Sequence, residues 1–181
     1  MVPIIFALVA ANPRPTLTVL GLALMAVGES VRLWAAAYLG LTARSSTPKA
    51  TKLVTRGPYG MTRHPLYWGN LCLTVGFCLA SGSGFPWFPT LVAVGFVILY
   101  TSHARREEHT LAQAFPGPYT RYRDRVPALR WALRGRSVPE VGNPGPPSVT
   151  RALRVEALTL NAEFWLLLAL WSRVRWLGQV G

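Results

Sequence analysis

The chain has 181 residues, of which 51% are hydrophobic and 14% charged, and its mean hydropathy is +0.28. Soluble proteins carry about 25% charged residues, so this composition excludes an intrinsically disordered chain. Lysine and arginine outnumber aspartate and glutamate by 19 to 7, a net charge of +12 that raises the question of a nucleic-acid partner. Residues 65–102, however, contain no charged side chain and no histidine, which indicates a bilayer.

Two apolar stretches precede that uncharged segment. Residues 2–11 are at most half a span, because ten helical residues reach only about 15 Å before a proline-rich break at residues 12–15. Residues 16–41 are long enough to cross once, since about 20 residues match a hydrocarbon core of about 30 Å. Glu29 and Arg32 lie within this stretch, and we expect them to form structural ion pairs between helices.

The uncharged segment is long enough for two spans. A turn rich in glycine and serine, residues 81–86, divides it. We therefore predict a helical hairpin with arms at residues 66–80 and 87–102. The first arm is slightly short for a full crossing.

Basic residues flank the hairpin on both sides, at residues 44–63 and 105–136. Positive residues flank membrane helices on the cytoplasmic side, and two crossings return the chain to the same face. Both clusters are therefore predicted to be cytoplasmic, so residues 16–41 run from outside to inside. Residues 157–171 form either a fourth short span or a helix lying in the interface. Residues 134–150, rich in proline and glycine, are predicted to be a linker or surface loop.

The hairpin brings two polar pairs to one membrane face, Arg63-His64 and Glu107-Glu108. Ionisable groups at that depth are costly unless they are paired or used, so we expect a binding site there. Structural alternatives remain open. Arg63 and His64 could serve only as membrane anchors, and Glu107 and Glu108 could serve only to neutralise neighbouring arginines. Interfacial aromatics are likewise the commoner role for tyrosines at this depth. No metal site is expected, because His103 and His109 lie six residues apart and do not share a helical face.

The motifs around these pairs form a two-part pattern. Gly57-Pro58-Tyr59 precedes Arg63-His64-Pro65-Leu66-Tyr67-Trp68-Gly69, and Glu107-Glu108 precedes Phe115, Tyr119 and Tyr122. This pattern resembles the membrane methyltransferase family that contains isoprenylcysteine carboxyl methyltransferases and phospholipid N-methyltransferases. The resemblance covers roughly residues 16–130. One departure is Thr51, where many members of that family have a histidine.

The resemblance implies an enzyme that uses S-adenosylmethionine, with S-adenosylhomocysteine as product, and a lipophilic acceptor arriving from the bilayer. The acceptor is a lipid amine or an isoprenoid or prenylcysteine-type carboxylate. By the same resemblance, Arg63 and Glu107 border the acceptor as catalytic residues: Arg63 would orient a carboxylate, and Glu107 would serve as base for an amine. The implied cofactor-binding residues are Leu53, Val54, Gly57, Tyr59, His64, Pro65, Tyr67, Gly69, Glu108, Tyr119 and Tyr122.

The sequence thus predicts an all-α polytopic membrane protein with about three to five membrane helices and a cytoplasmic cofactor pocket, in a bacterial inner membrane. Residues 1–133 would form the methyltransferase domain, 134–150 the linker and 151–181 a C-terminal apolar helix. Membrane lipids are expected partners. Nucleic acid is not expected, because membrane topology and anionic headgroups already account for the arginines. A catalytically silent binding or assembly factor of the same architecture is the alternative.

Overall fold

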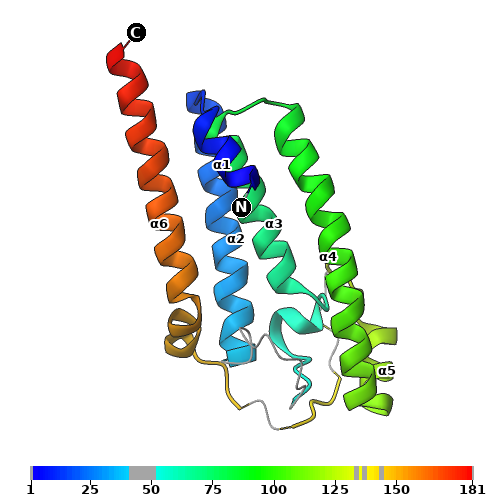
Figure 1. Cartoon of the computed structure of the whole chain (residues 1–181). Coiled ribbons are helices and arrows are strands. Elements are labelled where there is room, and N and C mark those ends of the chain that lie inside the picture. The colour runs from blue at the N-terminus through cyan, green and yellow to red at the C-terminus, as the bar shows by residue number, and fades with distance from the viewer. Residues whose placement is uncertain (1, 41–51, 133–134, 136–137, 143–144, 181) are drawn as a thin grey trace. The chain divides into compact units, whose positions relative to one another are not determined.

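The computed structural model describes residues 2–40, 52–132, 135, 138–142 and 145–180. Residues 41–51, which include Thr51 and part of the first basic cluster, lie outside the described residues. The described regular structure is helical, as Figure 1 shows, and its β structure is limited to one antiparallel bridge between Leu53 and Val141. The elements are α1 (Val2–Val9), α2 (Pro15–Leu39), the short 3-10 helix η2 (Gly57–Gly60), α3 (Pro65–Ser81), α4 (Trp87–Ala114), α5 (Pro116–Arg125) and α6 (Val149–Val180).

The all-α prediction is confirmed for the described residues, and α2, α3 and the start of α4 agree closely with the predicted helices. Gly82 and Gly84 in the turn between α3 and α4 have φ angles of +65° and +53°, which glycine adopts without steric cost. Two of the described helices, α2 and α4, are long and apolar enough to cross a membrane. Helix α4 continues well past residue 102, because no helix-breaking residue occurs before Pro116.

Contacts divide the chain into two compact units, which we describe separately. The apolar unit comprises residues 1–29, 69–98 and 157–181. The site unit comprises residues 30–68 and 99–156. Each unit contains parts of α2, α3, α4 and α6.

The core of the apolar unit is built from alanines, Met25, Phe77 and Leu170. Within it, α2 and α3 approach each other at glycines. A Cβ on Gly21 would lie 2.4 Å from the backbone nitrogen of Ala80 and 2.5 Å from the carbonyl oxygen of Gly76. Small residues of this kind let membrane helices pack backbone to backbone.

Gly21→Ala is therefore expected to destabilise the protein, because the new methyl group meets backbone atoms that cannot move aside independently. We expect a loss of about 1–3 kcal/mol of unfolding free energy, as for other overpacked sites. The measurement is the thermal midpoint of the detergent-solubilised protein. Gly95→Ala on α4 is the matched control, since a Cβ there would meet no described atom within 4 Å. Equal midpoints for the two variants would show that this helix contact is looser than described.

In the site unit, α6 packs on α2. Ala36 and Ala37 of α2 lie against Ala152 and Val155 of α6. One turn earlier in α2 and one turn later in α6, Arg32 and Glu156 form a buried ion pair. Arg32 thus contacts an acid of another helix, Glu156, which the sequence did not indicate. It ties the C-terminal helix to α2 inside the site unit.

The described part of the stretch rich in proline and glycine also packs in the site unit. Val138 is only 3% exposed and joins a core with Leu53 and three α5-region side chains, Tyr119, Tyr122 and Val126. Thr55 donates its hydroxyl proton to the carbonyl oxygen of Val138 over 2.5 Å. The backbone of Leu53 forms an antiparallel bridge with that of Val141. Residues 138–141 therefore pack beside residues 53–55.

Candidate functional site

The Gly57-Pro58-Tyr59 motif forms η2, a tight turn that buries its own side chains. Gly57 has a φ angle of +59°, and a Cβ there would lie 2.5 Å from the Tyr38 ring. Only glycine satisfies both constraints without strain. The hydroxyl of Tyr122 donates a 2.7 Å hydrogen bond to the carbonyl oxygen of Tyr59, which fixes the turn against α5.

Arg63, between η2 and α3, is fully engaged by the protein. Its Nε and Nη2 atoms lie 3.0 and 2.9 Å from Oε1 of Glu108. Its Nη1 atom donates to the carbonyl oxygens of Arg123 and Val126, each at 2.9 Å. All three nitrogen atoms therefore have protein partners, and the guanidinium joins α3, α4 and the end of α5 to one another.

His64 lies between the two carboxylates of α4. Its Nε2 atom is 2.9 Å from Oε1 of Glu108, and its Nδ1 atom is 3.6 Å from Oε2 of Glu107. The ring of Tyr67 stacks on the imidazole with centroids 5.1 Å apart, and its hydroxyl donates to Oε2 of Glu107 over 2.8 Å. The predicted meeting of Arg63-His64 with Glu107-Glu108 is thus confirmed, which excludes the view that these acids only neutralise neighbouring arginines.

These contacts set the charge of His64. Burial lowers the pKa of the imidazole, but the hydrogen bonds to Glu107 and Glu108 outweigh it, so the pKa of His64 is raised above its usual value. A proton on both ring nitrogens satisfies both carboxylates. The imidazolium is therefore the form that this arrangement stabilises.

The stability of the protein should consequently fall as pH rises above neutral. A group whose pKa is raised on folding stabilises the fold below its unfolded pKa, about 6.5, and loses that contribution as pH passes its folded pKa. Each unit by which folding raises the pKa of His64 corresponds to about 1.4 kcal/mol of folding stability. Thermal midpoints measured from pH 6 to 9 should decline in the wild type and decline less in His64→Gln. Parallel curves for the two proteins would contradict this assignment.

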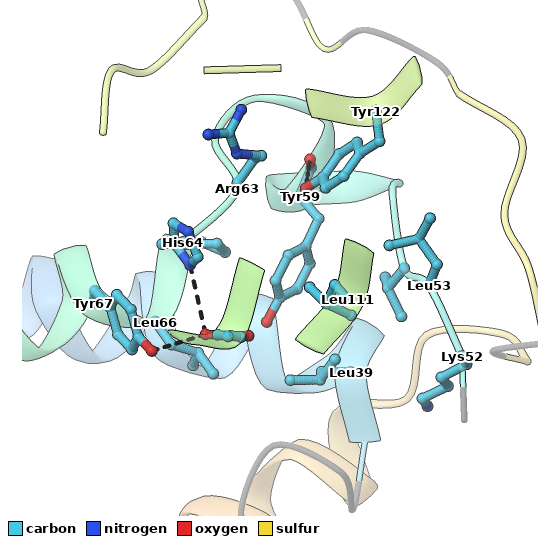
Figure 2. Close-up of a pocket in the computed structure, with 13 residues that line it drawn as sticks. Leu39, Lys52, Leu53, Tyr59, Arg63, His64, Leu66, Tyr67, Leu111 and Tyr122 are labelled. Atoms are coloured by element: carbon cyan, nitrogen blue, oxygen red, sulfur yellow. Dashed lines mark hydrogen bonds and ion pairs between the residues drawn. The ribbon is translucent and has the colours of Figure 1, made fainter. Parts of the chain in front are cut away.

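A pocket opens beside this cluster, and Figure 2 shows the residues that line it. One wall carries the polar groups of His64, Tyr67 and Glu107. The apolar part of the lining comes from the end of α2, from residues 53–54 and 65–66 and from α4. Glu107 is the acid that remains accessible, with its side chain half exposed against 21% for Glu108.

Tyr59 adds a polar group to the pocket. Its side chain is only 8% exposed, and its hydroxyl has no hydrogen-bond partner among the described residues. Burial raises the pKa of Tyr59 well above its usual value, so the phenol keeps its proton. A buried donor without a partner costs about 1–3 kcal/mol, which a bound molecule with an acceptor atom would recover.

The structure brings most of the sequence-predicted site residues together. Those that line the pocket are Leu53, Val54, Tyr59, Arg63, His64, Pro65, Tyr67, Glu107 and Tyr122. Glu108 lies directly behind them on Arg63 and His64, Tyr119 is buried in the core next to Leu53, and Gly57 shapes the turn. Gly69 belongs to the apolar unit, where its carbonyl oxygen packs closely against Gly28. Tyr119 and Tyr122 are each 2% exposed, so they are core residues and not interfacial aromatics.

Sequence reasoning missed four lining residues: Leu39, Lys52, Leu66 and Leu111. Leu111 carried a usable signal, because it lies four residues after Glu107 on the same helical face. Lys52 directly precedes the predicted Leu53-Val54 pair. The other two are ordinary apolar residues, and only the packing of their helices assigns them to the pocket.

The described helices thus include two that are long and apolar enough to cross a membrane, and the site unit holds a pocket with an accessible carboxylate. Residues 16–117, more than half of the chain, match the model of the phospholipid methyltransferase family. The chain belongs to this family. No solved structure matches it.

Several curated proteins are similar to parts of the chain. The nickel-cobalt-cadmium resistance protein NccN of Alcaligenes xylosoxydans xylosoxydans is 37% identical over 114 residues, and the cobalt-zinc-cadmium resistance protein CzcN of Cupriavidus metallidurans is 38% identical over 114 residues. Both alignments cover 63% of this chain but only 48% and 47% of those proteins, so the chain spans about half the length of these relatives. The Δ14-sterol reductase of Methylotuvimicrobium alcaliphilum is 30% identical over 81 residues, which is 45% of this chain and 19% of that protein.

Proposed function

We propose that the chain transfers a methyl group from S-adenosylmethionine to a lipophilic acceptor, at the cytoplasmic face of a bacterial inner membrane. Membership of the phospholipid methyltransferase family supports methyl transfer as the type of reaction. The two membrane-length helices support a lipid-soluble acceptor. The observation that carries the proposal is Glu107, a half-exposed carboxylate held by Tyr67 and His64 at the edge of an apolar pocket.

The chemistry of the pocket fits this cofactor. S-adenosylmethionine carries an ammonium and a sulfonium, which a carboxylate such as Glu107 attracts. The ring of Tyr67 offers an aromatic face for a cation, and the walls around Leu53 and Val54 suit an adenine. The unpartnered hydroxyl of Tyr59 supplies a hydrogen-bond donor inside the pocket.

When bound, the cofactor supplies a methyl group on a positively charged sulfur, an electrophile for an in-line displacement. The residues of the chain then have separate tasks. The apolar walls exclude water and hold the acceptor in line. Glu107 accepts the proton that an amine acceptor must lose before its lone pair can attack. Tyr67 and His64 hold the Glu107 carboxylate in place through their contacts with Oε2.

This geometry favours an amine acceptor over a carboxylate. A carboxylate acceptor would need Arg63 to orient it, but each nitrogen of Arg63 already has a protein partner. The accessible charge at this edge of the pocket is that of Glu107, which attracts an ammonium and repels a carboxylate. We therefore assign Arg63 a positioning role, through Glu108, in place of direct contact with the acceptor.

Calorimetric titration of the detergent-solubilised protein with S-adenosylhomocysteine tests the cofactor. We expect saturable binding and a higher thermal midpoint. Incubation of membranes with methyl-labelled S-adenosylmethionine then tests turnover, and label is expected in a lipid fraction that contains amines. Binding without any transfer of label would favour the catalytically silent alternative. The absence of binding would exclude the proposal.

A further inference from the structure

Two positive side chains lie near Gly40, and one of them, Lys52, lines the pocket. Lys52 is part of the pocket lining, and Figure 2 shows it on the side away from His64 and Tyr67. A Cβ built on Gly40 would lie 3.8 Å from Nζ of Lys52 and 3.5 Å from Nη1 of Arg151. Both charges therefore lie within 4 Å of one point beside Gly40.

Neither Lys52 nor Arg151 forms an ion pair with a carboxylate among the described residues, which include all seven acids of the chain, although Glu140 is near enough to act weakly on Lys52. In the site unit, Glu156 pairs with Arg32, Glu140 with Arg56, Asp124 with Arg123, and Glu107 and Glu108 with His64 and Arg63. The remaining acids, Glu29 and Glu163, belong to the apolar unit. Like charges without a counter-ion repel, so the arrangement is costly unless an anion joins it.

The position of Arg151 adds to this cost. It lies in the first turn of α6. The backbone nitrogen of Arg151 donates a hydrogen bond to the hydroxyl of Ser148, which caps the N-terminus of that helix. The N-terminus of a helix carries partial positive charge and favours anions. Burial and the charge of Arg151 together lower the pKa of Lys52, against a smaller opposing effect of Glu140. Both the helix end and the two side chains therefore favour a negative group at this point.

We propose that Lys52 and Arg151 form an oxyanion subsite at the end of the pocket opposite Glu107. The inference rests on the proposed function, because it concerns the same bound molecules. The hydroxyl of Tyr59, nine-tenths buried and without a partner among the described residues, is a further donor inside this pocket. The oxyanion is a carboxylate or a phosphate, and it comes either from the amino-acid part of the cofactor or from the headgroup of a lipid acceptor.

The test compares wild type with the double variant Lys52→Gln/Arg151→Gln in two arms. The first arm measures affinity for S-adenosylhomocysteine and for 5′-methylthioadenosine, which lacks the amino-acid carboxylate. The second measures affinity for dioctanoyl phosphatidate and for dioctanoylglycerol, which lacks the phosphate. In one arm, we expect the double variant to lose about tenfold of the preference for the molecule that carries the oxyanion, a loss that corresponds to one charge-assisted hydrogen bond. The arm that responds identifies the source of the oxyanion.

Arg130→Gln/Arg154→Gln is the matched control, because it removes two exposed positive charges from the same unit. This variant should keep both preferences within about twofold, and matching thermal midpoints would show that all three proteins are folded. Unchanged preferences in both arms for Lys52→Gln/Arg151→Gln would overturn the subsite. If wild type does not bind S-adenosylhomocysteine, the proposed function fails on its own, and the phosphatidate arm still decides whether the subsite exists.

Discussion

Replacing Glu107 with glutamine is expected to lower methyl transfer by about 10²–10⁴-fold, the usual effect of losing a general base. Glutamine has the same shape and can still accept the hydrogen bond that Tyr67 now donates to Glu107 over 2.8 Å. It cannot accept a proton from an ammonium, and it carries no charge to attract one. Turnover should therefore fall while the fold survives. The measurement is the rate of label transfer from S-adenosylmethionine at saturating cofactor.

Two comparisons isolate the role of Glu107. Tyr67→Phe removes the hydrogen bond but leaves the carboxylate, so it should cost much less activity than Glu107→Gln. S-adenosylhomocysteine should bind Glu107→Gln more weakly by a smaller factor than the loss in turnover, because the base acts mainly during proton transfer. Full activity in Glu107→Gln would remove this residue from the mechanism and reopen the choice between amine and carboxylate acceptors.

Glu108→Ala is expected to lower the unfolding free energy by about 3 kcal/mol, since it leaves the buried guanidinium of Arg63 without its carboxylate. The side chain of Arg63 is 12% exposed, and Oε1 of Glu108 also holds His64 at 2.9 Å. Activity should fall together with stability, because Arg63 and His64, the two partners of Glu108, line the pocket. Thermal and denaturant unfolding of the solubilised protein would measure the loss.

A double-mutant cycle distinguishes pairing from general damage. Arg63→Met/Glu108→Ala should cost less than the sum of the two single variants, because neither charge is then left alone in the interior. Asp124→Ala breaks an exposed ion pair of 3.8 Å with Arg123 and should change stability by no more than about 0.5 kcal/mol. Additive losses at Arg63 and Glu108 would show that the two side chains act independently.

The helices were largely predictable because apolar length and turn residues are local signals. Residues 16–41 were predicted and α2 is Pro15–Leu39, while the second hairpin arm was predicted to start at residue 87 and α4 begins at Trp87. The end of α4 was not predictable from hydropathy, whereas α6 lies close to the C-terminal helix predicted over residues 151–181. Helix α6 extends from Val149 to Val180, well beyond the apolar residues 157–171, because polar helix formers continue a helix that hydropathy does not detect.

The site was predictable in its members but not in their tasks. The motif pattern and the hairpin together placed Arg63-His64 opposite Glu107-Glu108, and the contacts confirm that meeting. The sequence could not show that Arg63 is fully engaged, since its partners include two backbone carbonyls at the end of α5. The pairing of Val141 with Leu53 was equally unreadable, because a single bridge leaves no periodic pattern.

The sequence by itself determined the helical class, the two membrane-length helices and most of the polar residues that line the pocket, because each follows from the order of side chains along the chain. Only the tertiary structure decided which charges are satisfied by the protein and which face the pocket. Arg63 and Lys52 are both cations near the same motif, yet the first has protein partners on every nitrogen and the second meets another cation. Electrostatic partners are chosen by distance in space, which local sequence does not specify.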